Sequence, residues 1–432
     1  MTQRLELTRH FPAMASSDYR ALWMASGASA VSIWALIMAR AWLALDLADS
    51  GFSVGIVTFA AMAPWTLAPI AGVLADRYDR ARMVVIARVV QVLLAVGLAA
   101  LAFTGELEVW HLVLFAFANG LGWSFERAGE SSLLPNTVDR QSLLNAITLV
   151  SLASFGSRLV GPLAAAPLLA GAGAGWIFVM SACFYLLAAG LTTRIRVRST
   201  GDVSVEGPIF AEARRGLAEA FRYLGANPQL KLIIAVVALH CFLTMSFDAL
   251  LPILARDVFD GGTSLFSAML MGIGGGALVG TLALSFVRRD ALRGRLFFAT
   301  GLVSGVGVAW VGLAPSPAMV VVGAVIVGAS QATFVALGSV LIQSVLPDGM
   351  RGRVMSLYAL FAGGVMAVMV FSNGTASDVV DTRMLLWLPA VAFVGLLLLW
   401  AALHSDLRRV FGEGTLYLGR EPQASGAPAG GR

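Results

Sequence analysis

The chain has 432 residues, of which 58% are hydrophobic and 13% charged, and its mean hydropathy is +0.82. So few charged side chains could not cover a water-soluble protein of this size, whereas lipid around apolar faces removes that need. The net charge of +5 does not indicate nucleic-acid binding, because the arginines fall in short segments between apolar runs. We therefore predict an all-α integral membrane protein whose basic loops set its topology and contact anionic membrane lipid.

Apolar windows of about 20 residues, enough for a helix to cross a bilayer, recur twelve times. They lie near residues 20–45, 52–74, 83–103, 109–127, 145–170, 174–193, 231–255, 264–287, 296–314, 317–345, 354–377 and 384–403. Residues 1–18 are polar and lack an apolar core, so the first window is expected to direct membrane insertion. The sequence thus predicts twelve transmembrane helices.

Basic residues predict the orientation of these helices. With both termini in the cytoplasm, all but four of the 30 lysines and arginines fall in cytoplasmic loops or at cytoplasmic span ends. Arg256 and Arg383 would face outward, and Arg40 and Arg158 would lie within spans. The excess of arginine over the single lysine is typical of a GC-rich bacterial genome. We expect a multi-pass protein of the bacterial inner membrane.

The longest polar connection, residues 194–230, divides the chain. We predict a six-helix half over 1–193, a cytoplasmic linker over 194–230, a second six-helix half over 231–404 and a disordered cytoplasmic tail over 405–432. Apolar residues recur at helical spacing within 209–226, which favours an amphipathic helix on the cytoplasmic membrane surface. A solvated linker helix is the alternative.

An internal repeat relates the two halves at an offset of about 212 residues. Residues 134–136 read Leu-Pro-Asn, and residues 346–348 read Leu-Pro-Asp. Asp76-Arg77 likewise falls opposite Arg288-Arg289, and further arginines follow in both copies. The repeat predicts two pseudo-symmetric halves in parallel order around a central site.

A polar stretch between the second and third windows carries five charges in seven residues. Its marked residues are Gly72, Asp76, Arg77, Asp79, Arg80 and Arg82. This pattern resembles the loop signature of the major facilitator superfamily. The aspartate at position 79, where many relatives have glycine, makes it similar to the branch that contains bacterial siderophore (enterobactin-type) and macrolide exporters. Residues 19–23, 131–136 and 347–356 resemble the same branch, and the resemblance extends over about 18–404.

The resemblance implies a secondary transporter that exports a siderophore or an amphipathic drug by alternating access, with protons as the expected coupling ion. Two departures count against the usual drug–proton arrangement. Residues 161–166 read Gly-Pro-Leu-Ala-Ala-Ala, where antiporters of the superfamily often have Gly-Pro-x-x-Gly-Gly. Residues 116–125 contain no arginine, although drug–proton antiporters often carry one in this span.

The loop signature predicts a cytoplasmic gate. Gly72 would let two helices approach closely, and Asp76 would accept hydrogen bonds from a helix N-terminus, which the resemblance places at span eleven near Arg353. The neighbouring arginines would pair with Glu126 and Glu130; in the alternative reading they only enforce topology. The candidate gate residues are Gly72, Asp76, Arg77, Asp79, Arg80, Arg82, Glu126, Glu130, Arg351 and Arg353.

Three charged residues lie within predicted spans, where charge is costly unless it faces a cavity or a partner. Arg158 is expected to line the central path, or else to pair with Glu126 or Glu130. Asp248 suits proton carriage, and a pair with Arg40 would join the two halves. The alternatives are snorkelling of Arg40 to the interface and a helix-capping role for Asp248 at Pro252. We predict a substrate or proton pathway through Arg40, Arg158 and Asp248.

No catalytic constellation, cofactor motif or metal-ligand spacing occurs in the sequence, and no phosphate-binding loop with lysine is present. Cys183 and Cys241 fit small buried hydrophobes. We expect a monomeric transporter of a small molecule and not an enzyme. Two other functions stay open: an importer of an anionic solute bound by Arg158 and Arg40, and a non-transporting sensor or scaffold on the same fold.

Overall fold

The regular structure is entirely helical in the computed structural model, which describes residues 11–197, 209–287 and 289–416. Within these ranges the side chains of Asp76, Leu144, Ile209, Glu212 and Asp348 are outside the description. Arg288, which the repeat places opposite Asp76, also lies outside the described residues, as does the predicted tail beyond residue 416.

The N-terminal half runs from residue 11 to residue 197. Its elements are η1 (Pro12–Ala15), α2 (Ser17–Ala48), α3 (Gly51–Met62), η2 (Ala63–Leu67), α4 (Ala68–Arg77), α5 (Arg80–Thr104), α6 (Val109–Leu133), η3 (Leu134–Thr137), η4 (Arg140–Ser142), α7 (Leu143–Pro167), η5 (Leu168–Ala172) and α8 (Ala174–Thr192).

Helix α9 (Ile209–Ala226) joins this half to the C-terminal one. The elements of the C-terminal half are α10 (Pro228–Thr244), α11 (Leu250–Ile253), η6 (Leu254–Val258), α12 (Gly262–Leu284), α13 (Asp290–Leu313), α14 (Pro317–Val345), α15 (Asp348–Ala359), η7 (Leu360–Gly364), α16 (Val365–Ala376), α17 (Thr382–Leu403) and α18 (Ser405–Glu413).

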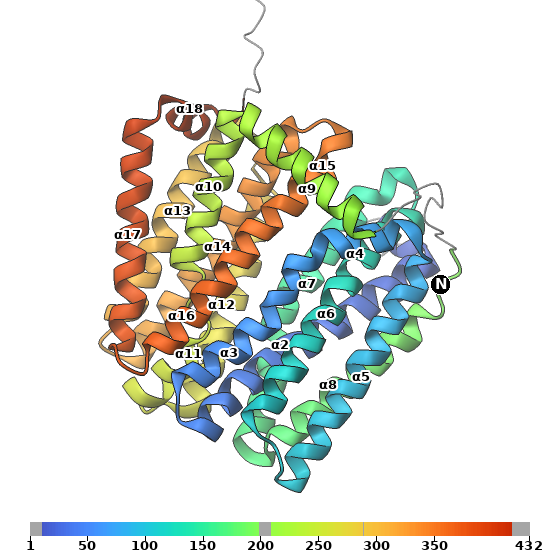
Figure 1. Ribbon diagram of the computed structural model, residues 1–432, viewed down its shortest axis with the longest axis vertical. Helices are drawn as coiled ribbons and strands as arrows, with labels where there is room; N and C mark the ends of the chain where they lie inside the picture. Colours follow the sequence, from blue (N-terminus) through green and yellow to red (C-terminus); the bar gives the residue numbers. More distant parts are fainter. Residues whose placement is uncertain (1–10, 198–208, 288, 417–432) are drawn as a thin grey trace, which may run out of the picture.

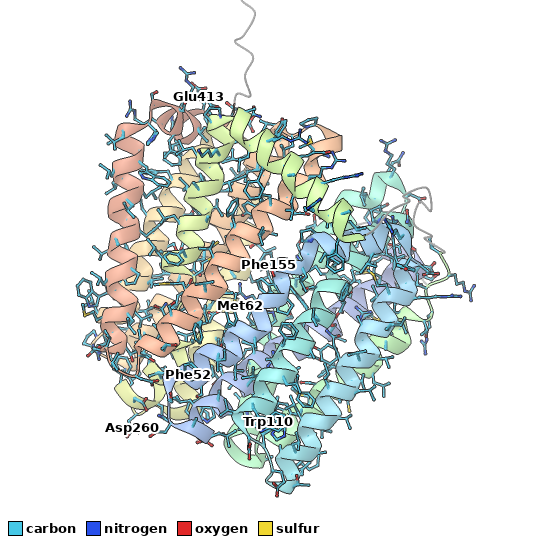
Figure 2. All side chains as sticks on the ribbon, in the orientation of Figure 1. Phe52, Met62, Trp110, Phe155, Asp260 and Glu413 are labelled. Atoms are coloured by element: carbon cyan, nitrogen blue, oxygen red, sulfur yellow. The ribbon has the colours of Figure 1, made fainter. Side chains whose placement is uncertain are left out.

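The two halves lie side by side, with α9 running across one end of the molecule toward the N-terminal half (Figure 1). We call this end, which also holds α18 and Glu413, the linker end (Figure 2). The other end, which holds Phe52, Trp110 and Asp260, is the opposite end (Figure 2). Long helices connect the two ends in both halves.

The prediction of an all-helical membrane protein is confirmed. In the described part of the chain, ten helices are long and apolar enough to cross a membrane, or eleven if α9 and α10 count as one bent span. The expected count of twelve would add α6, which is 25 residues long but carries charges at positions 126, 127 and 130.

Three predicted spans are interrupted in the structure. The second is divided by η2, where Pro64 lacks an amide hydrogen, and the eleventh by η7. The seventh stops at Thr244, and distant side chains satisfy the freed backbone: Gln331 donates to the Thr244 carbonyl at 2.6 Å, and Asn373 donates to the Ser246 carbonyl at 2.8 Å. Such partners are needed wherever a helix breaks within a membrane.

The predicted linker helix is present as α9, and it bends by 111° into α10. It packs against α4 of one half and α15 of the other. Its apolar face buries Ala213, Ala220 and Leu224, and Arg353 of α15 forms an ion pair with Glu219 on its polar face. The helix therefore contacts both halves at the linker end.

The prediction of a disordered tail from residue 405 is wrong for its first residues. Residues 405–413 form α18, which packs on α13. This short helix docks through one apolar face, whose residues Leu407, Val410 and Phe411 are buried. Gly294 allows the approach, because a Cβ there would lie 2.3 Å from the Val410 carbonyl oxygen.

Glycines bring α12 and α14 together within the C-terminal half. A Cβ at Gly276 would lie 2.0 Å from the Val325 carbonyl oxygen, and one at Gly280 would lie 2.5 Å from that of Ala329. Small residues at four-residue spacing allow such backbone contact between membrane helices. The backbones of α12 and α14 therefore lie in direct contact.

Candidate functional site

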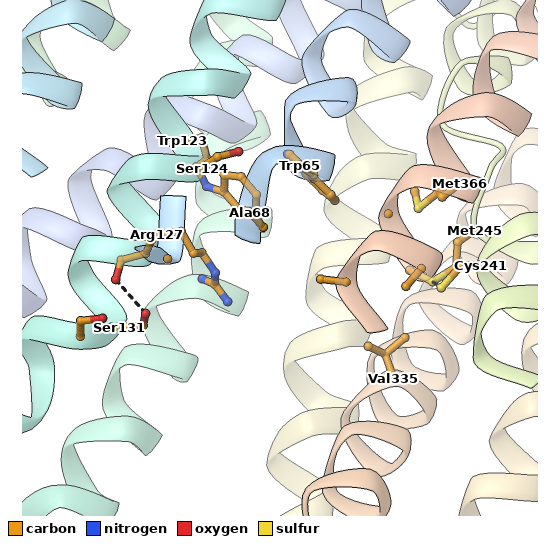
Figure 3. A pocket seen from close by; sticks show the side chains of 16 residues that line it. Trp65, Ala68, Trp123, Ser124, Arg127, Ser131, Cys241, Met245, Val335 and Met366 are labelled. Atoms are coloured by element: carbon orange, nitrogen blue, oxygen red, sulfur yellow. Dashed lines mark hydrogen bonds between the residues drawn. The ribbon is translucent and has the colours of Figure 1, made fainter. Parts of the chain in front are cut away.

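A cavity of about 510 Å³ lies between the two halves (Figure 3). Trp65 of η2 and Trp123 of α6 stand on its N-terminal wall with ring centroids 4.7 Å apart. The cavity extends toward the linker end as far as Ser131 and Ser132. Its lining residues are Trp65, Ala68, Gly72, Trp123, Ser124, Arg127, Ala128, Ser131, Ser132, Cys241, Met245, Val335, Ala359, Ala362, Gly363 and Met366.

The chemistry of this cavity is apolar with one cationic group. The Arg127 guanidinium carbon lies 5.7 Å from the centroid of the Trp123 ring, a cation–π arrangement. Met245, Val335 and Met366 stand on the facing wall (Figure 3). Flexible, polarisable methionine adapts to molecules of varied shape. The space therefore suits an amphipathic molecule with a flat apolar part and a hydrogen-bond acceptor or anionic group.

The loop between α4 and α5 ties the hinge to its neighbours. Asp79 caps α5 by accepting from the Arg82 amide at 3.1 Å. Arg80 donates to the carbonyls of Ala75 at 3.1 Å and Ser132 at 3.2 Å. The loop is therefore bonded to the end of α6, which forms one edge of the cavity.

Gly72 has a different place from the one expected. A Cβ there would meet no described atom within 4 Å, so the predicted close approach of two helices at Gly72 is wrong for this conformation. Gly72 instead lines the cavity, where the missing side chain leaves room. The side chain of Asp76 lies outside the described residues, and Arg77 is the last residue of α4. The latch role of both stays a prediction.

Glu126 and Glu130 lie one turn apart on α6, and both contact Arg88 of α5. Arg88 donates through Nε to Glu126 at 2.9 Å and through another nitrogen to Glu130, which also accepts from Ser26 at 2.5 Å. The Arg88 side chain is fully buried, so it faces the interior of the N-terminal half. The two carboxylates compensate its charge inside the bundle, and the Thr192 hydroxyl accepts a further hydrogen bond from it.

The C-terminal gate arginines lie at the start of the eleventh span. Arg353 pairs with Glu219 of α9, as described above, and Arg351 donates to the Leu346 carbonyl at 3.5 Å. Sequence reasoning did not select Glu219, although its position on the polar face of the linker helix was a usable signal. The ion pair joins the linker helix to the second half beside the cavity.

Arg158 and Asp248 come together across the interface between the halves. Both line a small cavity of about 30 Å³ with Trp34, and the Arg158 guanidinium carbon lies 4.3 Å from the Trp34 ring centroid. Gly274 of α12 makes the contact tight, because a Cβ there would lie 2.6 Å from the Arg158 carbonyl. These residues form a polar layer beyond the main cavity, toward the opposite end.

Arg40 is not the partner of Asp248 that the repeat suggested. Its Nε donates to the Leu36 carbonyl at 3.2 Å, and Nη1 donates to Asn119 Oδ1 at 3.4 Å. Arg40 is 4% exposed, so it does not snorkel to the membrane surface either. It lies inside the N-terminal half, and Asp248 instead lines a small cavity together with Arg158 of the other half.

At the opposite end, Asp378 caps α3 of the other half. Its carboxylate accepts from the amides of Gly51 at 2.6 Å and Phe52 at 3.1 Å, and from the Ser50 hydroxyl at 2.8 Å. Partial burial raises the pKa of Asp378, but these hydrogen bonds outweigh it and lower the pKa below the usual aspartate value. The cap holds α3 and α16 together.

Glycines complete this closure. A Cβ at Gly374 of α16 would lie 2.5 Å from the Gly55 Cα of α3, so the two backbones touch. Nearby, Arg256 forms an ion pair with Asp49, again between the halves. The interface is therefore closed at the opposite end, whereas the cavity separates the halves nearer the linker end.

Comparison with protein families gives one match over almost the whole chain. Residues 8–410 match the family described as transmembrane secretion effector. The chain belongs to this family, within the major facilitator superfamily. The transmembrane secretion effectors are transporters rather than enzymes, and this chain is accordingly a multi-pass membrane transporter.

Two kinds of curated relative share this architecture. Macrolide efflux protein A of Streptococcus pyogenes is 24% identical over 352 residues, which cover 80% of this chain and 85% of the relative. Enterobactin exporter EntS of Escherichia coli is 26% identical over 346 residues, 79% of this chain and 80% of the relative. The resemblance to the branch of siderophore and macrolide exporters is thus confirmed.

Solved structures confirm the fold of this transmembrane secretion effector. A POT family transporter in complex with 5-aminolevulinic acid superposes with a TM-score of 0.74 at 12% identity, covering 91% of this chain and 97% of that one. An inward-facing, unoccupied bacterial homologue of the human lysosomal transporter Spinster gives 0.62 at 17% identity, covering 93% and 98%.

Proposed function

We propose that this transporter exports a small organic molecule, either a siderophore or an amphipathic drug, across the bacterial inner membrane by alternating access. The observation that carries the proposal is the cavity between the halves, which has a tryptophan pair and Arg127 on one wall and a closed interface beyond it. The bias of basic residues favours the linker end as the cytoplasmic one. In this orientation the cavity lies nearer the cytoplasmic side, and the interface beyond it is closed.

The proposed transport cycle uses the cavity nearer the linker end and the closed contact between the halves at the opposite end. The substrate enters from the cytoplasm, stacks its flat part on Trp65 and Trp123, and places its acceptor group at Arg127. Rocking of the halves then tightens the existing contact between α4 and α15 and separates α3 from α16. The arginines of the hinge loop and of α15 act as the cytoplasmic latch in the outward-open state.

The proposed coupling step uses Arg158 and Asp248. In the outward-open state Asp248 is accessible to a proton from outside, and its neutralisation lowers the cost of burying it beside Arg158 as the halves close again. Release of the proton to the cytoplasm in the inward-open state restores the charge. An inward proton gradient would thereby drive outward movement of the substrate.

Export assays on cells and everted membrane vesicles test this function. A macrolide and a catecholate siderophore are suitable first substrates, because the relatives are named for such molecules. Replacing both Trp65 and Trp123 by alanine removes the stacking platform and should lower export about tenfold or more. Trp176→Ala is the matched control, since this tryptophan is 50% exposed on α8. Equal export by the double variant and the control would sink the proposal.

The direction of transport is decided by the same vesicles. Uptake into everted vesicles corresponds to export from cells, whereas counterflow that favours entry into right-side-out vesicles would assign the chain as an importer. A sensor or scaffold would move neither substrate nor protons in either preparation. Arg40 packs against Asn119 inside one half, so the pair of anion ligands on which the importer reading rested is not supported.

A further inference from the structure

A second groove of about 560 Å³ lies on the C-terminal half, outside the space between the halves. Helix α10 forms its floor, and α9, η7, α16 and α17 form its walls. Phe221 of α9 meets Phe361 of η7 edge-on, with ring centroids 5.9 Å apart. Its lining residues are Phe221, Leu224, Gly225, Lys231, Ile234, Ala235, Ala238, Leu239, Phe242, Phe361, Val365 and Trp400.

The groove has the length of one lipid acyl chain within one leaflet. On α10 it runs from Lys231 to Phe242, a separation of eleven steps along the helix, or about 16 Å at 1.5 Å per step. A leaflet contributes about 15 Å of hydrocarbon, half of a core about 30 Å thick. Ala235 and Ala238 keep the floor of the groove shallow, while its walls carry aliphatic and aromatic side chains.

The two ends of the groove differ in charge. Lys231, the only lysine of the chain, lines the groove in the first turn of α10 and is exposed. Trp400 stands in the last turn of α17 on the same side, and α9 turns away there by 111°. An interfacial tryptophan, an amphipathic helix and an exposed ammonium together mark the level of lipid headgroups.

We propose that this groove binds one phospholipid with an anionic headgroup, whose phosphate contacts Lys231 and whose acyl chain lies along α10. A membrane phospholipid is the occupant that fits, because η7, α16 and α17 belong to candidate membrane spans and the charged end of the groove lies near the bend between α9 and α10. The acyl chain fills the space between α9 and the C-terminal half. The lipid therefore contacts both α9 and the C-terminal half and stabilises the position of the linker helix.

The test uses the full-length protein in detergent, with phosphatidylglycerol and phosphatidylcholine added in turn. Native mass spectrometry gives the bound lipid, and thermal unfolding gives the stabilisation. Wild type should bind phosphatidylglycerol about fivefold more tightly than phosphatidylcholine, the effect expected of one basic side chain at the membrane surface. Lys231→Gln should abolish this preference, and Lys231→Arg should keep it.

Two bulky substitutions separate the groove from general lipid contact. Ala238→Trp fills the floor and should remove the tightly bound lipid of both kinds. Leu93→Trp, at a side chain 66% exposed on α5, should bind lipid as wild type does. Equal binding of the two lipids by wild type, or unchanged binding by both Lys231→Gln and Ala238→Trp, would overturn the proposal. So would stabilisation by inorganic phosphate alone, or displacement of the lipid by an exported substrate.

Discussion

Arg88 of α5 donates through Nε to Glu126 of α6 at 2.9 Å, and the two side chains are 0% and 4% exposed. A second contact joins Arg88 to Glu130, so one cation serves two carboxylates inside the N-terminal half. In such an arrangement the charges depend on one another, because each would be costly to bury alone.

Replacing Arg88 by methionine should therefore destabilise the protein strongly. The change leaves the buried carboxylate of Glu126 and the partly buried one of Glu130 without their cation. Loss of one partner of a buried pair costs about 3–5 kcal/mol. Thermal unfolding of the purified transporter in detergent measures the loss. Adding Glu126→Gln and Glu130→Gln to Arg88→Met should restore much of the stability, because no unpaired charge then remains.

Arg82→Ala is the control for this prediction. The Arg82 side chain is 83% exposed and lies 3.9 Å from Asp79, an arrangement that contributes at most about 1 kcal/mol. If Arg88→Met were no more destabilising than Arg82→Ala, the buried network would not be a support of this half.

Gly374→Ala should disturb closure at the opposite end and leave insertion into the membrane intact. The added Cβ would lie 2.5 Å from the Gly55 Cα, so α16 and α3 could not keep their contact. We expect export to fall about tenfold or more at normal protein level, if the closed state is raised by about 1.4 kcal/mol or more.

Gly395→Ala on α17 is the matched control, because a Cβ there meets no described atom within 4 Å. Spin labels at exposed Leu47 and Val379, in a background without the native cysteines, report the separation across this end. An unchanged separation in Gly374→Ala would contradict the assigned role of the contact.

Much of this fold is predictable because membrane helices follow from local composition. The halves, the linker helix and the charged hinge could all be recognised from windows, repeats and arginine placement. The break after Thr244 could not, because residues 245–249 contain no proline or glycine. The break is stabilised by Gln331 and Asn373, which approach it only in the folded bundle.

The partners of buried charges were harder to predict than their positions. Pseudo-symmetry suggested Arg40 for Asp248, yet the packing of α7 on α12 brings Arg158 there. Arg88 resembles any basic residue near the end of a span, and only the neighbouring Glu126 shows that it faces inward. Side-chain direction across a helix interface is a tertiary property.

Acid should weaken closure at the opposite end through Asp378. Because its pKa is lowered in the closed structure, closure is favoured above the usual aspartate pKa and is lost as pH falls through the lowered value. Asp378→Asn should therefore open this end at neutral pH and remove the pH dependence. Label separation between Leu47 and Val379 as a function of pH measures both effects; a pH response retained in Asp378→Asn would assign the effect to another group.

Asp248→Asn should uncouple transport from the proton gradient. Asparagine keeps the size of the side chain but removes the charge that attracts Arg158, so the polar layer would no longer respond to a proton. In reconstituted vesicles we expect the proton gradient to give no accumulation of substrate, while exchange of substrate across the membrane continues. Asp257→Asn, on an aspartate whose side chain is 44% exposed at the opposite end, should keep gradient-driven transport. Full gradient-driven accumulation by Asp248→Asn would show that the coupling group lies elsewhere.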